Sequence, residues 1–279
     1  AGTRRVLDFA EDCAARGGLR RLSHVSTAYV AGTHRGRFGE DDLDVGQDFH
    51  NSYEQTKWEA ERLVRAHASH LPIQILRPSI VVGETDSGWT SSFNVIYTPL
   101  RAFARGALPA IPARRSAPVD VVSVSYVADA ILALGDGEHP CRTYHLTAGA
   151  DACTVGELIR LSADTLGRRP PVTLPPRLYR RLLHPLLLRR SSGARRRWLE
   201  RSDVFFPYFA PAVRFDTARA RAALDPSGIR PAPLPQYFDR LIDFAQRSDW
   251  GRGPAPKPVV ERGLAAQARA VVTGRAAAA

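Results

Sequence analysis

The alternation of helical and strand patterns over the first 150 residues is the feature that most constrains the fold of this chain. Apolar residues repeat with helical spacing from Val6 to Ala14, and a short apolar run, Leu22 to Val25, follows. A polar loop at 32–48 leads to a long helical pattern from about Ser52 to His70, and then to a second apolar run, Ile73 to Leu76. Further patterns follow in chain order: a helix at 94–105, a strand at 119–124, a helix at 126–134 and a strand at 144–146. Because buried strands that alternate with helices form parallel sheets covered on both faces, we expect an α/β fold with a doubly wound parallel sheet.

After residue 150 the pattern predicts helices without strands. Thr154 and Glu157 form a capping box ahead of a helix that runs to about Leu166, and further helices are expected at 216–224 and 235–247. From residue 251 onward Pro, Gly, Ala and Arg dominate, a composition typical of flexible tails. We therefore expect a first domain over residues 1–150, a small and mainly helical domain over 151–250, and a tail over 251–279.

The positive charge is concentrated in one segment. The chain carries a formal net charge of +11, and residues 168–201 contain eleven arginines against a single acid, Glu200. Leucines interleave with these arginines, so the segment is basic and amphipathic. It could contact the phosphates of coenzyme A, an acyl-carrier protein or an anionic membrane surface, or it could be a solvated basic face with its leucines in the core. No nucleic-acid-binding motif accompanies the charge, which argues against a nucleic-acid partner.

Three scattered cysteines predict a reducing compartment. Cys13, Cys141 and Cys153 follow no disulfide or zinc-ligand spacing, so we expect neither a disulfide framework nor a metal site. No stretch of 18 uninterrupted apolar residues occurs in the sequence. The expected location is the cytoplasm, with peripheral contact at a membrane as an alternative.

Two short motifs carry the chemistry, His24–Gly32 and Asn51–Lys57. The first places the hydroxyls of Ser26 and Thr27 after a strand, at the edge where open parallel sheets bind ligands. The second places Tyr53 and Lys57 four residues apart on one helix face. A phenol ionises only near about pH 10, and a neighbouring ammonium stabilises the phenolate, which suits a tyrosine to proton transfer near neutrality. The alternative is a tyrosine that makes an ordinary contact on a helix face.

With these motifs the sequence resembles the extended short-chain dehydrogenase/reductases, and within them the thioester-reductase and fatty acyl-CoA reductase (male sterility-like) branch. The resemblance covers residues 2–149 well and extends loosely to 247. Arg77–Gly83 matches the strand and loop that line the nicotinamide in this family. The resemblance implies that Thr27 polarises the substrate carbonyl, with Ser26 in support. The residues that it implies at the cofactor are Ser26, Tyr53, Lys57, Pro78, Ser79 and Ile80.

Two of these residues have further implied roles. Tyr53 would donate a proton to the developing alkoxide. Lys57 would bind the ribose hydroxyls of the nicotinamide half and make Tyr53 more acidic. The implied cofactor is NADP or NAD, with NADPH favoured.

The resemblance also implies a Gly-rich turn on a first strand, which holds the pyrophosphate, and this turn does not occur in the sequence. The sequence contains no methionine and opens inside a helical pattern. We therefore expect the chain to be about the last two-thirds of a larger reductase, with an N-terminally truncated Rossmann-like domain.

The function implied by the resemblance is an NAD(P)H-dependent reduction of an acyl thioester or an aldehyde, with the thioester favoured. Two enzyme alternatives in the same superfamily remain: a sugar-nucleotide epimerase or dehydratase, and a hydroxysteroid-type dehydrogenase. The same catalytic residues would serve all of them. A third alternative is a non-catalytic NAD(P)-sensing scaffold or inactive fragment.

Overall fold

A three-stranded parallel sheet forms the centre of the first half of the chain. The computed structural model describes residues 2–93, 95–108, 110–136, 138–190, 192–193, 196 and 212–254. The sheet has the order β1-β3-β8. Its strands are β1 (Leu22–Val25), β3 (Ile73–Pro78) and β8 (Thr143–Leu146). These are the apolar runs that the sequence pattern predicts as strands.

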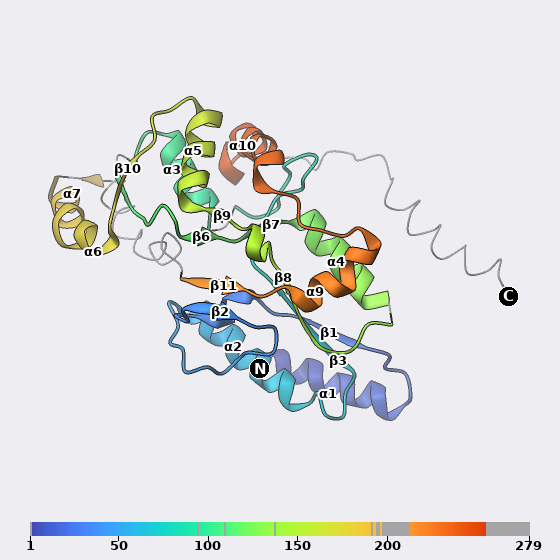
Figure 1. Ribbon diagram of the computed structural model, residues 1–279. Helices are drawn as coiled ribbons and strands as arrows, with labels where there is room; N and C mark the ends of the chain where they lie inside the picture. Colours follow the sequence, from blue (N-terminus) through green and yellow to red (C-terminus); the bar gives the residue numbers. More distant parts are fainter. Residues whose placement is uncertain are drawn as a thin grey trace.

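Helices cover both faces of this sheet (Figure 1). On one face lie α1 (Gly2–Ala15) and α2 (Ser52–Ala66), and on the other lie α4 (Val124–Asp136) and α9 (Ala218–Leu224). The side chains of β3 alternate between the two layers: Ile73 and Ile75 pack against the first pair of helices, and Leu76 packs on the opposite side. The expected α/β fold with a doubly wound parallel sheet is thereby confirmed.

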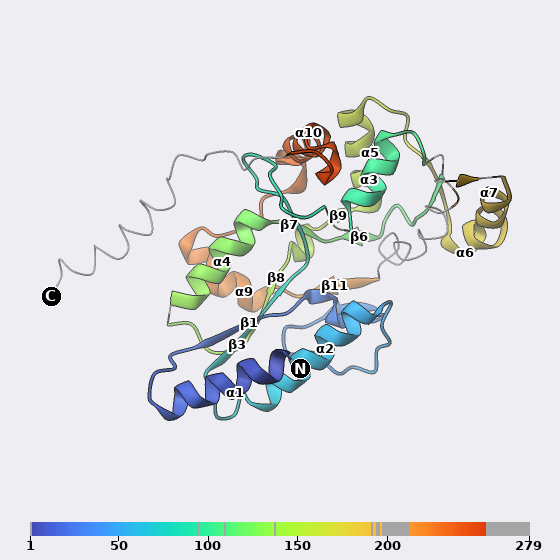
Figure 2. The same cartoon turned by 180° about the vertical axis from the view of Figure 1, so that it is seen from behind.

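A second layer of helices surrounds a larger core (Figure 2). The parallel pair β4 (Ile80–Val82) and β7 (Val121–Ser123) leads into it. Around this core lie α3 (Tyr97–Ala104), α5 (Val155–Leu166) and α10 (Phe238–Arg247). The last of these is strongly amphipathic, because its buried residues recur at helical spacing: Phe238, Leu241, Ile242 and Ala245.

The prediction that strands stop after residue 150 was wrong. The structure has β9 (Cys153–Thr154), β10 (Val172–Leu174) and β11 (Val213–Phe215). They pair, respectively, with β6 (Pro118–Val119), β5 (Ala110–Pro112) and β2 (Gly36–Phe38). Each is only two or three residues long, too short for an alternating pattern to be visible, and each is stabilised by a partner strand that lies far away in the sequence.

The return of β11 to β2 brings residues from both sides of the expected division near residue 150 into one sheet. Both β11 and α9 pack with elements of the first 150 residues. Strand β11 pairs with β2, which lies within the loop at 32–48, and α9 contacts α4 and β8. Glu40 from that loop receives hydrogen bonds from the backbone N–H groups of Arg219 and Ala220 at 2.7 and 3.0 Å. The polar loop at 32–48 therefore buries a carboxylate at the start of α9.

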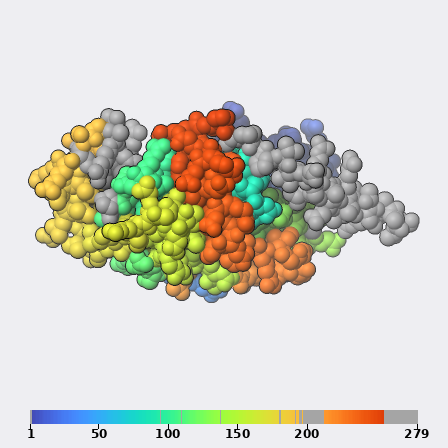
Figure 3. All heavy atoms as spheres, turned by 90° about the horizontal axis from the view of Figure 1, so that it is seen from above, coloured from blue at the N-terminus to red at the C-terminus, as the bar shows by residue number. Residues whose placement is uncertain are grey.

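The basic segment begins at one end of the molecule (Figure 3). It forms β10, a short turn α6 (Pro176–Leu178), a π-helical turn η3 (Tyr179–Leu183) and α7 (His184–Arg190). Most of residues 191–211, and the expected tail from residue 255, lie outside the described residues. Short 3-10 helices complete the fold: η1 (Ala28–Ala31), η2 (Gly149–Asp151), η5 (Asp225–Ser227), η6 (Leu234–Gln236) and η7 (Asp249–Gly251). Among the described helices, none combines the length and the hydropathy needed to cross a membrane.

Candidate active site

The predicted hydroxyl residues lie at the carboxyl edge of the parallel sheet. Ser26 follows β1, and its backbone N–H donates to the carbonyl of Leu76 at 2.8 Å. The Thr27 hydroxyl donates to the carbonyl of Pro78 at 3.4 Å and accepts from the N–H of Tyr29 at 3.3 Å. Thr27 thereby caps η1 and joins the ends of β1 and β3. Open parallel sheets bind their ligands at this edge.

Helix α2 carries the second motif to the same edge. The helix begins at Ser52 because the side chain of Asn51 accepts a hydrogen bond from the N–H of Glu54 at 3.0 Å. Lys57 donates from Nζ to the carbonyl of Val25, the last residue of β1, at 3.3 Å. Tyr53, one turn earlier, has 53% of its surface exposed. The structure thus holds the lysine against the strand end that leads into Ser26 and Thr27, with the tyrosine beside it open to solvent.

Pro78, Ser79 and Ile80 cross from the central sheet to the β4–β7 pair. The N–H of Ser79 donates to the carbonyl of Leu146 at the end of β8, and the N–H of Ile80 donates to the carbonyl of Asp120, both at 3.3 Å. These backbone bonds fix the crossing at the same edge as Thr27. The position agrees with the expected nicotinamide contact, which remains a prediction for these three residues.

Three buried hydroxyls lie along this edge, each on the residue directly after a strand of the central sheet. They belong to Ser26, Ser79 and Thr147, and none makes a side-chain hydrogen bond of normal geometry with the described residues. The Ser26 hydroxyl helps to lower the pKa of Glu61, and the Ser79 hydroxyl opposes the rise that burial causes in the pKa of Asp120. Because buried polar groups are almost always paired, the Thr147 hydroxyl, which has no partner among the described residues, fits a site whose ligand supplies the missing partner.

Asp120 holds the loop after β8 in place. Its carboxylate accepts hydrogen bonds from the N–H groups of Ala148 and Gly149, both at 2.8 Å. Burial raises the pKa of Asp120, and the Ser79 hydroxyl and these two N–H groups oppose the rise. No sequence pattern assigns Asp120 a role, because the backbone groups that it binds are close to it only in the folded chain.

A fully buried ion pair lies behind the site. Arg77 donates to the two carboxylate oxygens of Glu61 at 2.6 and 3.0 Å, and both side chains have no exposed surface. Glu61 lies on α2 one turn after Lys57, and Arg77 precedes Pro78 in β3. Arg77 also donates to the carbonyl of Asp42 at 2.6 Å. The pair therefore joins the helix that carries Tyr53 and Lys57 to the strand that ends at Pro78.

We did not predict this ion pair from the sequence, although the sequence contains a sign of it. An arginine inside an otherwise apolar strand needs a buried partner, and Glu61 is four residues from Lys57 on the same helix face. Burial acts to raise the pKa of Glu61, but the charge and hydrogen bonds of Arg77, with help from the Ser26 hydroxyl and the charge of Arg65, bring the pKa below its ordinary value. Glu61 is therefore a carboxylate at neutral pH.

His145 completes the buried network. Its Nδ1 donates to the carbonyl of Asp216 at 2.7 Å, and its Nε2 accepts from Arg77 at 3.1 Å, so the neutral ring satisfies both nitrogens. The ring stacks on Phe38 at a centroid distance of 6.0 Å. Burial, and then the charge of Arg77, lower the pKa of His145 to about 3.

We expect the free energy of unfolding to fall as the pH drops from about 6.5 toward 3, in part because of His145. In this range the unfolded chain binds a proton at His145 and the folded chain does not, so acid favours unfolding. The contribution of His145 is about 2 kcal/mol between pH 6.5 and pH 5. Urea unfolding at several pH values should show a shallower pH dependence for His145→Gln. A control, His139→Gln on the loop after α4, should retain the slope of the unmodified protein; equal slopes for all three proteins would contradict the prediction.

No group of three or more His, Cys, Asp or Glu side chains in the described part of the chain is arranged to hold a metal ion. The site is thus built from hydroxyls, a phenol and an ammonium.

Comparison with known proteins identifies relatives of the chain. Residues 1–131 match the profile of an NAD-binding family described as male sterility protein. Fatty acyl-CoA reductase 2 of Homo sapiens is 35% identical over 111 residues, which are 37% of this chain and 22% of that protein. The curated relatives that the chain matches are each covered over less than half of their length.

The comparison with solved structures agrees with the family match. The terminal R domain from the myxalamid PKS-NRPS biosynthetic pathway superposes with a TM-score of 0.71 at 25% identity, over 91% of this chain and 63% of that one. The dTDP-glucose 4,6-dehydratase from Bacillus anthracis in complex with NAD gives a TM-score of 0.60 at 15% identity, over 88% and 67% of the two chains. The second likeness shows the fold alone. Together with the family match, the first confirms the resemblance to the thioester-reductase and fatty acyl-CoA reductase branch.

Proposed function

Because residues 1–131 carry the match to the male sterility protein family, we propose that this chain contributes the reacting groups of an NAD(P)H-dependent reductase that acts on acyl thioesters. The observation that carries the proposal is the docking of α2 on the end of β1 by Lys57. It brings the Tyr53–Lys57 face next to the strand that ends in Ser26 and Thr27. A phenol, an ammonium and hydroxyls at the carboxyl edge of a parallel sheet suit carbonyl reduction.

The residues present fit a dinucleotide at this edge. Lys57 uses one N–H for the carbonyl of Val25, and its ammonium has two more hydrogens to donate to ribose hydroxyls. The buried hydroxyls of Ser26, Ser79 and Thr147 lie along the same edge. Pro78, Ser79 and Ile80 would contact the nicotinamide, which supplies a hydride when it is bound. NADPH is the favoured form and NAD the alternative.

In the proposed reaction each group of the chain has one role. Thr27 turns its hydroxyl from Pro78 toward the substrate carbonyl and stabilises the charge that develops on its oxygen. Tyr53 donates its phenolic proton to that oxygen. Lys57 stabilises the resulting phenolate and holds the ribose. Reduction of a thioester gives a thiol and an aldehyde, and the same groups can serve reduction of the aldehyde.

The charged surface supports a thioester that carries phosphates. Arg177, Arg181, Arg189 and Arg190 are exposed on α6–α7, and Leu178, Leu182 and Leu186 are exposed on the same segment. Tyr179, Leu183 and Leu187 instead pack inward against Ala110 and Leu174. The expected contact of residues 168–201 with coenzyme A, an acyl-carrier protein or a membrane thus remains part of the proposal.

The test is a comparison of substrates in the protein that contains this chain. We expect NADPH consumption with a straight-chain acyl-CoA in a series from butanoyl-CoA to hexadecanoyl-CoA, and an aldehyde or alcohol product identified by mass spectrometry. The same protein should leave UDP-glucose and a ketosteroid unchanged. Turnover of a sugar nucleotide or steroid without turnover of any thioester would instead favour the other branches of the superfamily. Cofactor binding without turnover of any of these substrates would favour the NAD(P)-sensing scaffold.

A further inference from the structure

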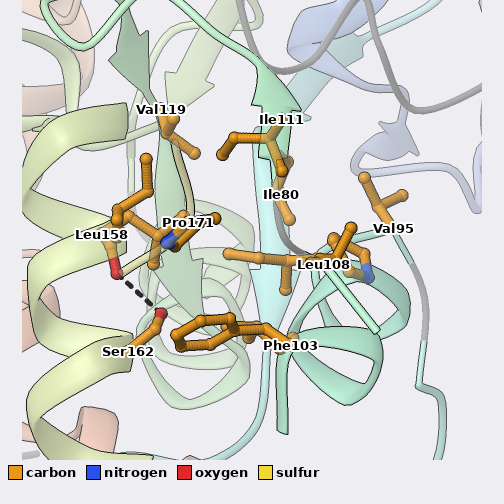
Figure 4. A pocket seen from close by; sticks show the side chains of 13 residues that line it. Ile80, Val95, Phe103, Leu108, Ile111, Val119, Leu158, Ser162 and Pro171 are labelled. Carbon is orange, nitrogen blue, oxygen red and sulfur yellow. Dashed lines mark hydrogen bonds between the residues drawn. The ribbon is translucent and has the colours of Figure 1, made fainter. Parts of the chain in front are cut away.

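An apolar pocket lies between α3 and α5, in the second layer of the fold (Figure 4). Its walls come from four places: β4 supplies Ile80, the β5–β6 region supplies Ile111 and Val119, α3 supplies Phe103, and α5 supplies Leu158 and Ser162. In Figure 4 the side chains from the strands lie at one end of the pocket, and those of Phe103 and Ser162 lie together at the other.

The lining offers no free polar group to a ligand. Ser162 is the single hydroxyl residue among the lining residues, and its Oγ donates to the carbonyl of Leu158 within the same helix at 2.6 Å. A ligand here therefore gains from apolar contact alone. The pantetheine and phosphate groups of a thioester would lose their hydration without any new partner, so only a hydrocarbon group fits.

One wall of the pocket comes from a residue close in the chain to the candidate active site. Ile80 lines the pocket and is two residues after Pro78, whose carbonyl accepts the hydrogen bond from Thr27. Consecutive Cα atoms are about 3.8 Å apart, so the Cα atoms of Pro78 and Ile80 are at most about 7.6 Å apart. A hydrocarbon chain of a few carbons spans such a distance. A carbonyl held by Thr27 can thus have its attached chain directed past Ile80.

We propose that this pocket binds the alkyl chain of the substrate and that Phe103 and Ser162 set the chain length that is accepted. The inference rests on the proposed function, because it places the acyl group of that same thioester. The cavity measures about 70 Å³. It is roughly half of an engineered apolar cavity of about 150 Å³ that stays dry and binds benzene, so it takes a few methylene groups.

Two variants change the length of the pocket in opposite directions. Ser162→Phe fills its far end, and Phe103→Leu opens that end while keeping an apolar side chain. Each methylene that enters an apolar site raises kcat/KM by up to about fourfold. We expect Ser162→Phe to lower kcat/KM for the longest accepted thioester about tenfold or more and to shift the optimum to shorter chains. Phe103→Leu should shift the optimum to longer chains.

The measurement uses straight-chain acyl thioesters from butanoyl to hexadecanoyl, with Leu132→Ala on the exposed face of α4 as the matched control. In parallel, calorimetry measures binding of the corresponding fatty acids to the same proteins without cofactor. Unfolding curves identify a variant that has lost its fold. Loss of fold lowers activity at every chain length, whereas the proposal requires shifts of opposite sign in the two variants.

The outcomes separate the inference from the proposed function. Turnover of thioesters with an unchanged chain-length profile in both folded variants would overturn the alkyl site and leave the reductase intact. Opposite shifts in fatty-acid binding, without turnover of any thioester, would support the alkyl site and contradict the reductase. Binding of fatty acids that neither variant alters would overturn the pocket assignment.

Discussion

Replacing Tyr53 by phenylalanine should lower kcat about 10²- to 10⁴-fold, the usual contribution of a general acid. The substitution removes only the phenolic hydroxyl. The Tyr53 side chain is about half exposed. The free energy of unfolding should therefore change by less than about 0.5 kcal/mol. The measurement is steady-state turnover of an acyl thioester, with cofactor affinity determined separately by fluorescence titration.

The matched control is Tyr144→Phe, which removes a tyrosine hydroxyl far from the proposed chemistry. That hydroxyl donates to the carbonyl of Pro140 at 2.8 Å. We expect the control to retain most of the turnover. If Tyr53→Phe and Tyr144→Phe gave equal rates, Tyr53 would be an ordinary residue on a helix face, the alternative that the sequence leaves open.

The second large effect concerns the buried pair of Glu61 and Arg77. We expect Glu61→Gln to lower the free energy of unfolding by about 3–5 kcal/mol, because it leaves the guanidinium of Arg77 buried without a counter-charge. Both side chains are fully buried, so solvent does not screen the pair. Urea unfolding at neutral pH measures the loss. A change below about 1 kcal/mol would show that the carbonyl of Asp42 and the ring of His145 suffice to stabilise Arg77.

Two further variants test whether the loss comes from the unpaired charge. Adding Arg77→Met to Glu61→Gln removes both charges, and the double variant should lose less than the sum of the two single variants. Glu59→Gln, on the exposed face of the same helix, should change stability by less than about 0.5 kcal/mol.

The pH dependence of the pair follows from the lowered pKa of Glu61. The unfolded chain binds a proton at a higher pH than the folded chain does, so the stabilisation is complete above the ordinary carboxyl pKa near 4.5. It is lost as the pH falls through the lower pKa of the folded state. The unmodified protein should therefore lose part of its advantage over Glu61→Gln in acid.

Local sequence patterns were sufficient for the central elements and for the helix face that carries Tyr53 and Lys57. The apolar runs at 22–25 and 73–76 became β1 and most of β3. The run at 73–76 is mainly apolar because β3 is buried along its whole length, whereas β1 alternates between half-buried and exposed residues. The four-residue spacing of Tyr53 and Lys57 places them on one face of any α-helix, whatever the rest of the chain does. The capping side chain of Asn51 likewise acts on its own helix.

Contacts between distant segments were decided only by the tertiary structure. The strands β10 and β11 are three residues each and exist because β5 and β2 pair with them. Arg77 and Glu61 are 16 residues apart, and His145 reaches Asp216 across 71 residues. The apolar pocket between α3 and α5 is likewise lined by residues that lie between positions 80 and 171 of the sequence. Periodicity reports how one segment distributes its own side chains, whereas pairing, burial of charge and cavity shape depend on which segments meet once the chain is packed.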